Sequence, residues 1–178
     1  MAEQLWQNWL AYRGGVLVGV VALAFGYAWW RWYRPHRHGA AEAAMVCGTV
    51  PWLYLAMLPH GDGPGGVSLV PLRDLALFLP DPVDFVTQVV GNLLVFAALG
   101  FFAPVRFAAL ASVPRMFAVG AAGSLAIELA QLLARTGRVF SVDDILLNAA
   151  GAALAAALSR GWWAQEPVHQ VNGRSASA

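Results

Sequence analysis

The stretch SLAIELAQLLARTGRVFSVDDILLNAAGAAL, from Ser124 to Leu154, decides the fold that we predict for this chain. It consists of two apolar segments and a short connection, and polar side chains recur in all three parts. These polar residues are Glu128, Gln131, Arg138, Asp143, Asp144 and Asn148. An ionised carboxylate in hydrocarbon costs about 2.5–3.5 kcal/mol on insertion scales. A chain that carries one in an apolar segment therefore has a partner for it or a use for it.

Composition places the chain among integral membrane proteins. Its 178 residues are 59% hydrophobic and 12% charged, whereas soluble domains carry about 25% charged residues. This length fits a single membrane domain. His36 and His38 have no carboxylate or cysteine partner that would complete a metal site. We therefore expect no metal and no cofactor, and nothing in the sequence indicates nucleic-acid binding.

Apolar segments separated by polar ones predict an all-α, polytopic bundle of about five transmembrane helices, since one span needs about 20 residues. The first four spans are expected at Gly14–Trp30, Ala43–Leu58, Phe85–Val105 and Met116–Leu133. The last segment, Ile145–Leu158, is shorter, and it is either a short fifth span or a re-entrant helix. The segments Gly61–Pro82 and Arg135–Ser141 are expected to be loops.

The arginines predict the orientation of these spans, because cytoplasmic loops carry an excess of basic residues. With five spans, one side holds Arg31, Arg34, Arg37, Arg106, Arg115, Arg160 and Arg174. We expect this side to be the cytoplasm of a bacterial cell, with the N-terminus outside and the C-terminus inside. The predicted organisation is an extra N-terminal span with a basic loop over residues 1–42, a membrane domain over residues 43–160 and a disordered cytoplasmic tail over residues 161–178.

Polar side chains are spaced so that they share one face on each of the last three spans. Residues at i, i+4 and i+7, and residues that follow a four-residue step, lie on the same side of a helix. The three stripes are Asp84, Gln88 and Asn92; Ser124, Glu128 and Gln131; and Asp144, Asn148 and Gly151. We expect the stripes to meet in an outward-facing polar pocket, with Arg138 neutralising a carboxylate through two hydrogen bonds. The candidate binding residues are Asn92, Glu128, Gln131, Arg138, Asp144 and Asn148.

Two interpretations of these polar residues stay open. Interhelical hydrogen bonds also hold membrane bundles together, and we favour this structural interpretation for Ser124 and for the amide side chains. Three carboxylates near one arginine exceed what a helix clasp requires, so Glu128 and Asp143 are candidates for a general acid or base. Asp74 is expected to be a solvated loop carboxylate. We favour a binding protein over an enzyme, a proton-coupled transporter or a structural subunit.

The same residues resemble the signature of the VanZ-like family of small bacterial membrane proteins, over about Leu53 to Leu158. VSLVPLRDL from Val67 resembles the family's NLxPF loop, and GNLLVFAALG from Gly91 resembles its NxxxFxPxG helix. SLAIELAQ carries the family's Ser, Glu and Gln, and GRVFSVDDILLNAAG resembles R-x-x-D-[IV]-x-D-[LIV]-x-x-N-x-x-G. The chain departs from these patterns at Ser68 for Asn, Leu72 for Phe, Ala98 for Pro and Ser141 for Asp.

The resemblance implies a helical membrane fold and a link to the cell envelope, because the family is named for a protein that gives resistance to the glycopeptide antibiotic teicoplanin. It implies no particular reaction. Together with the polar stripes, it leads us to expect that the protein binds a membrane lipid or another amphipathic molecule, such as a lipoglycopeptide. A role in glycopeptide resistance is a further expectation of the same resemblance.

Overall fold

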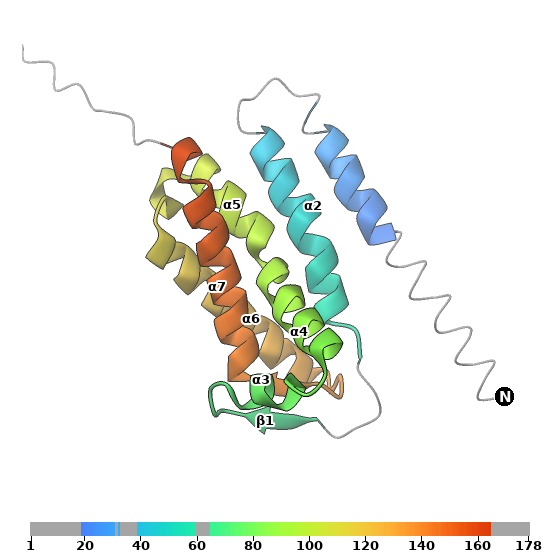
Figure 1. Ribbon diagram of the computed structural model, residues 1–178. Helices are drawn as coiled ribbons and strands as arrows, with labels where there is room; N and C mark the ends of the chain where they lie inside the picture. The colour runs from blue at the N-terminus through green and yellow to red at the C-terminus, as the bar shows by residue number, and fades with distance from the viewer. Residues whose placement is uncertain (1–18, 31, 33–38, 60–64, 165–178) are drawn as a thin grey trace, which may run out of the picture.

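The computed structural model describes residues 19–30, 32, 39–59 and 65–164, which form a bundle of helices lying side by side (Figure 1). A helix over Gly19–Trp30 precedes the labelled elements. These are α2 (Gly39–Ala56), β1 (Gly66–Ser68), α3 (Arg73–Phe78), α4 (Pro82–Val95), α5 (Ala97–Arg106), the 3-10 turn η1 (Ala108–Leu110), α6 (Val113–Leu133), β2 (Val139–Ser141), α7 (Val142–Leu158) and the 3-10 turn η2 (Arg160–Trp162). The predicted all-α class is confirmed.

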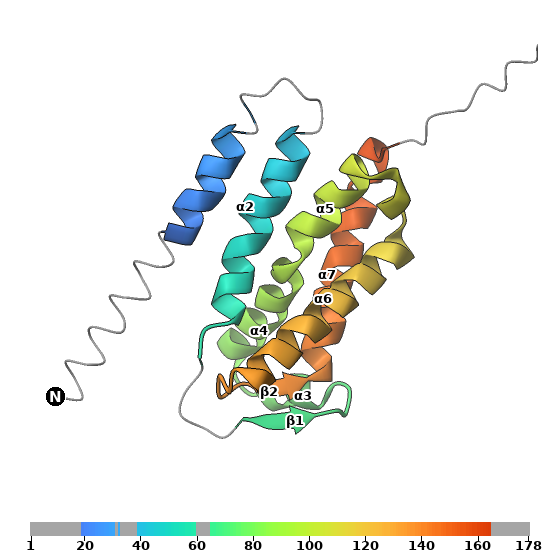
Figure 2. The same cartoon turned by 180° about the vertical axis from the view of Figure 1, so that it is seen from behind.

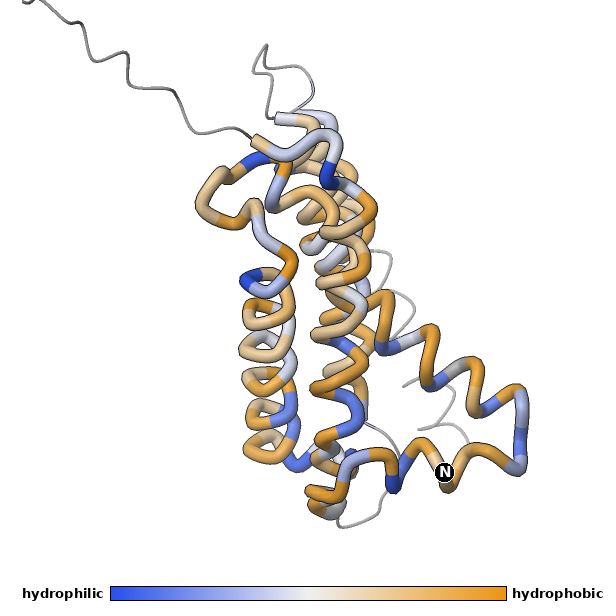
Figure 3. Tube along the Cα trace, turned by 60° about the vertical axis from the view of Figure 1, so that its left-hand side comes forward, coloured by the Kyte–Doolittle hydropathy of each residue, from blue (hydrophilic) through white to orange (hydrophobic). Residues whose placement is uncertain are grey.

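Within the described residues, two helical segments are long and apolar enough to cross a membrane by length and composition. They are Pro82–Arg106, which joins α4 and α5, and Val113–Leu133. In Figure 3 the helices are coloured mostly as hydrophobic along their length. Residues 14–18 of the expected first span, the arginines at 31, 34 and 37, and residues 165–178 of the expected tail lie outside the described part.

The third predicted span is bent rather than continuous. Phe96 separates α4 from α5 and has φ −112° and ψ 11°, outside the helical range. Its side chain is buried and belongs to a core cluster with Val95 and Ala152. The bend therefore coincides with the place where this segment packs against α7.

Two segments that we predicted to be loops contain regular structure, so those predictions were wrong. Gly61–Pro82 includes β1 and α3, and Arg135–Ser141 includes β2. The strands pair in parallel, with Gly66 opposite Val139 and Ser68 opposite Ser141. Each strand has only three residues and depends on the other for its hydrogen bonds, although β2 lies some seventy residues after β1 in the chain. Figure 2 shows β1, β2 and α3 together at one end of the bundle.

The last helix, α7, runs lengthwise between the other helices from the β1–β2 end to the opposite end (Figure 1). Its 17 residues span about 25 Å at 1.5 Å per residue. It packs against α4, α5 and α6 through small residues. Ala149, Ala152 and Ala156 are fully buried, and a Cβ atom at Gly120 of α6 would lie 2.9 Å from the Cβ atom of Ala152. Small residues thus bring these helices close together.

The two ends of the bundle carry different charges. One end joins the C-terminal end of α5, the start of α6 and η2, and Ala164 N–H donates to Pro104 O there at 2.9 Å. Arg106, Arg115 and Arg160 belong to these elements. The opposite end gathers the starts of α3, α4 and α7, which carry most of the described aspartates. This acidic end holds the polar residues that we predicted to meet.

Candidate functional site

Asp143 lies in the first turn of α7 and binds the backbone at the start of α3. Its side chain is 4% exposed. One carboxylate oxygen accepts Leu72 N–H at 2.5 Å, and the other accepts Asp74 N–H at 3.0 Å and Leu75 N–H at 3.1 Å. The first N–H groups of a helix have no partner within it, so Asp143 caps α3 from another element. Both of its oxygens are occupied by backbone donors.

Asp74 binds both strands of the β1–β2 pair, so the expectation that it is a solvated loop carboxylate was wrong. Ser68 Oγ donates to Asp74 Oδ1 at 2.8 Å, and Ser141 Oγ donates to Asp74 Oδ2 at 2.6 Å. Ser68 and Ser141 face each other in the β1–β2 register. They are also two of the positions at which the chain departs from the VanZ-like motifs. The two serines therefore hold one carboxylate from both strands.

We predict that Ser68→Ala lowers the free energy of unfolding by about 1.5 kcal/mol, because it removes a hydrogen bond to a charged acceptor. Ser141→Ala should lower it further, because Ser141 Oγ also accepts Asp143 N–H at 3.2 Å as the N-cap of α7. The double variant should lose less than the sum, since both serines serve the same carboxylate. Chemical denaturation in detergent measures the change. Ser112→Ala is the matched control, because the Ser112 side chain makes no capping bond to α6. Equal stability of the wild-type protein, the two single variants and the double variant would contradict the prediction.

Asp144 joins two of the predicted polar stripes. Its Oδ1 atom accepts Gln88 Nε2 at 2.8 Å and Asn92 Nδ2 at 2.7 Å, both from α4. Among the described residues, Asp144 Oδ2 has no hydrogen-bond partner. The two amides hold the carboxylate in one orientation, in which a single oxygen carries both internal bonds.

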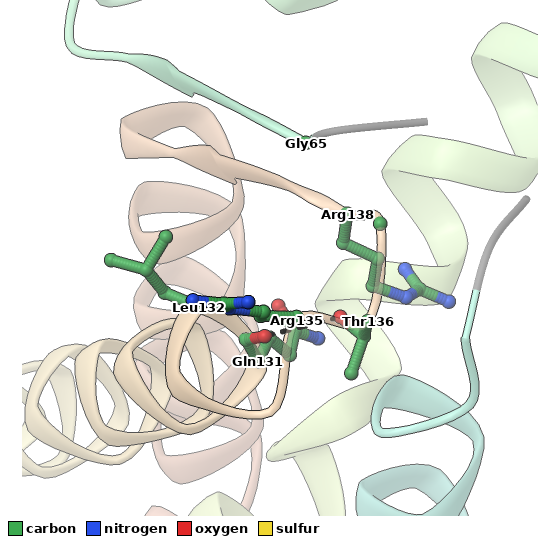
Figure 4. A pocket seen from close by; sticks show the side chains of 7 residues that line it. Gly65, Gln131, Leu132, Arg135, Thr136 and Arg138 are labelled. Carbon is green, nitrogen blue, oxygen red and sulfur yellow. Dashed lines mark hydrogen bonds between the residues drawn. The ribbon is translucent and has the colours of Figure 1, made fainter. Parts of the chain in front are cut away.

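Glu128 and Arg138 do not form the ion pair that we expected. Glu128 is 4% exposed, and its Oε2 atom accepts Ser141 N–H at 3.2 Å. Arg138 Nε donates to Leu58 O at 3.2 Å. No carboxylate in the described part of the chain lies within 4.0 Å of the Arg138 guanidinium. The side chain of Arg138 extends away from the α6–β2 connection (Figure 4), and so reaches the end of α2 instead.

The remaining candidate binding residues connect helices. Gln131 is buried, and its Nε2 atom donates to Ala56 O at 2.8 Å. Asn148 is also buried, and its Nδ2 atom donates to Ser124 Oγ at 2.8 Å. Asn148 Oδ1 is buried and has no hydrogen-bond partner among the described residues. Gln131 thus ties α6 to α2, while Asn148 ties α7 to α6 deeper in the bundle.

A cavity of about 480 Å³ opens at the acidic end, and we call it the end cavity. It is lined by Asp74, Leu77, Phe78, Gln88, Gln131, Gly137, Arg138, Val139, Ser141 and Asp144. A neighbouring hollow of about 500 Å³ shares three of these residues and adds Gly65, Leu132, Arg135 and Thr136 (Figure 4). Of the candidate binding residues, Gln131, Arg138 and Asp144 line the end cavity.

The other candidates support this cavity without lining it. Asn92 holds Asp144, Glu128 holds the backbone of Ser141, and Asp143 holds the segment that carries Asp74. Sequence reasoning missed Asp74, Ser141 and the apolar lining residues. Asp74 lies within the VSLVPLRDL stretch, which is dominated by apolar residues, and its serine partners were the only signal available. In the described part of the chain, no group of three His, Cys, Asp or Glu residues is placed to hold a metal ion.

A comparison with known protein families finds a match. A family model described as VanZ/LLP1 matches residues 14–163. The matched range begins before the helix Gly19–Trp30 and includes every segment that lines the end cavity. No curated protein and no solved structure matches the chain. Because the match extends over more than half of the sequence, the protein belongs to the VanZ/LLP1 family.

Proposed function

We propose that this protein is a multi-pass membrane protein of the bacterial cell envelope that binds an amphipathic molecule, a lipid or a lipoglycopeptide, in the end cavity. The observation that carries the proposal is the mixed lining of this cavity. Asp144, Arg138 and Gln88 supply charged and amide groups, while Phe78 and Val139 supply apolar surface. Its volume of about 480 Å³ is in the range of small-molecule sites, about 300–1,000 Å³.

The arrangement of charge supports a membrane orientation in which the end cavity opens outward. Arg106, Arg115 and Arg160 belong to the end opposite the cavity, and basic residues favour the cytoplasmic side. The exposed leucines of α6, among them Leu125, Leu129 and Leu132, suit contact with lipid tails. We propose that the helices from Gly19 to Leu158 form five spans, with α4 and α5 as one span and α7 as the short last one.

The positions of the two candidate acid–base residues favour binding over catalysis. A general acid or base has to reach the group whose proton it transfers. Glu128 and Asp143 are both buried, and neither lines the end cavity. Each instead accepts backbone N–H groups that shape the walls.

Filling the end cavity with an uncharged side chain tests the proposal. We expect Val139→Trp to remove the lipids or other amphipathic molecules that co-purify with the wild-type protein, as measured by native mass spectrometry. Val139 lies on β2 and lines the cavity. Val67→Trp is the matched control, because Val67 is exposed on the neighbouring strand and does not line the cavity. Retention of the same molecules by Val139→Trp would overturn the proposal.

A link to glycopeptide resistance is part of the proposal and has its own test. Expression of the wild-type protein in a teicoplanin-susceptible bacterium should reduce susceptibility, and Val139→Trp should not. The same susceptibility with both proteins would remove resistance from the proposal and leave lipid binding to be judged by mass spectrometry.

A further inference from the structure

Two opposite charges face the end cavity, and each has polar atoms that no described residue uses. Asp144 Oδ1 accepts two amide hydrogen bonds, whereas Asp144 Oδ2 accepts none from the described residues. Arg138 uses Nε to bind Leu58 O, and its two terminal nitrogens have no hydrogen-bond partner there. Both residues line the same cavity, yet their charged groups are more than 4.0 Å apart. Asp144 and Arg138 therefore face the same cavity without forming an ion pair with each other.

Both charged groups are held in place by other contacts. Gln88 and Asn92 reach Asp144 from α4, so that carboxylate cannot turn toward Arg138 without losing two hydrogen bonds. The bond from Arg138 Nε to the end of α2 holds the guanidinium away from Asp144 in the same manner. Charges that are partly removed from water need partners. A ligand that carries one charge of each sign would satisfy both groups at once.

The balance of charge on the cavity wall indicates which charges the ligand carries. Asp74 is the second carboxylate of the lining. Within the described part of the chain, its oxygens accept the two serine hydroxyls and no cation. Two carboxylates therefore face one guanidinium. A guanidinium binds phosphate through paired N–H donors, and an ammonium group supplies the donors that the carboxylates lack. An anionic head group alone would leave both carboxylates unmatched.

We propose that the end cavity recognises a zwitterionic head group that combines a phosphate with a primary ammonium, as in phosphatidylethanolamine. The phosphate binds the terminal nitrogens of Arg138, and the ammonium donates to Asp144 Oδ2 and faces Asp74. Leu77, Phe78 and Val139 contact the glycerol and the first part of the acyl chains. This inference rests on the proposed function and names the ligand class of that site.

Competition between lipids of equal acyl chains tests the inference on the full-length protein in detergent. Native mass spectrometry of the wild-type protein should show about tenfold tighter binding of phosphatidylethanolamine than of phosphatidylglycerol, equivalent to 1.4 kcal/mol. Phosphatidylcholine should bind more weakly than phosphatidylethanolamine, because its quaternary ammonium has no N–H to donate. Equal or tighter binding of phosphatidylglycerol by the wild-type protein would overturn the inference.

Two variants assign the charges to their residues. Asp144→Asn keeps an oxygen for Gln88 and Asn92 and removes the charge, so it should bind both lipids equally. Arg138→Gln should weaken both lipids to a similar extent, since both contain a phosphate. The matched controls are Asp84→Asn and Arg73→Gln, which make the same charge changes at exposed positions of the same end outside the cavity. A lipid preference that survives Asp144→Asn, or that both controls abolish, would overturn the inference.

A soluble competitor distinguishes a lipid from its head group and requires no variant. O-phosphoethanolamine should displace bound phosphatidylethanolamine from the wild-type protein, whereas glycerol phosphate should not. Displacement by both compounds to the same extent would overturn the zwitterion inference. Lipid binding without any head-group preference would overturn this inference alone. Absence of all lipid binding, with no effect of Val139→Trp, would overturn the proposed function with it.

Discussion

Replacing Gly151 with alanine should lower the free energy of unfolding by about 3 kcal/mol, the upper part of the range for overpacked cores. A Cβ atom at this position of α7 would overlap Leu93 O, and it would lie 2.8 Å from Leu93 Cα. The obstacle is the backbone of α4, which cannot rotate aside as a side chain would. The helices must therefore separate. Thermal unfolding in detergent, followed by tryptophan fluorescence, measures the loss.

Gly91→Ala provides the matched control for this change. Gly91 lies on α4, and a Cβ atom there would meet nothing within 4 Å. Alanine is favoured over glycine in a helix by about 1 kcal/mol, so Gly91→Ala should be as stable as the wild-type protein or more stable. Gly100→Ala should behave like Gly151→Ala, because its Cβ atom would overlap Ala152 O. If Gly151→Ala has the same unfolding temperature as the wild-type protein, α4 and α7 do not pack as closely as described.

Asp143→Ala should release α3 from the bundle at a cost of about 3 kcal/mol. Three backbone N–H groups lose a charged acceptor, and hydrogen bonds to charged groups contribute about 1.5–3 kcal/mol each. The expected loss is smaller than the sum of three such bonds, because the segment is partly exposed and water can bind some of the freed N–H groups. Leu72, which has a φ of 66°, also loses the bond that stabilises its left-handed conformation.

Hydrogen exchange should show that the effect of Asp143→Ala is local. The amides of Leu72, Asp74 and Leu75 should exchange faster by about two orders of magnitude, which corresponds to about 3 kcal/mol. Amides in the middle of α7 should keep their protection. Asp84→Ala is the matched control, because Asp84 is an exposed first-turn carboxylate. Unchanged protection at Leu72, Asp74 and Leu75 would contradict the capping role of Asp143.

Helix positions were largely predictable, because the signal is local. The segment predicted as Met116–Leu133 is α6, Val113–Leu133, with the same last residue. The spacing of Gln88 and Asn92 predicted one face of α4, and that face meets Asp144. In both cases the information lies within one helix, where apolar length and a repeat of four residues are sufficient.

Contacts between distant segments were not predictable in the same way. The β1–β2 pair and the cap on α3 join residues about seventy positions apart, and each segment alone has the composition of a loop. The partner of Arg138 was also missed. Opposite charge led us to pair Arg138 with a carboxylate. The position of its backbone instead places its Nε atom beside Leu58 O.

The sequence by itself determined that this chain is a bundle of apolar helices with polar faces, and it identified the family through residues on those faces. Only the tertiary structure decided which polar residues line a cavity and which ones hold its walls. Both oxygens of Asp143 accept backbone N–H groups, and Glu128 holds the Ser141 N–H with one oxygen outside the cavity lining. Asp144 lines the cavity, and one of its oxygens has no hydrogen-bond partner among the described residues. That difference depends on the packing of α3, α4 and β2 around the start of α7, which no single segment encodes.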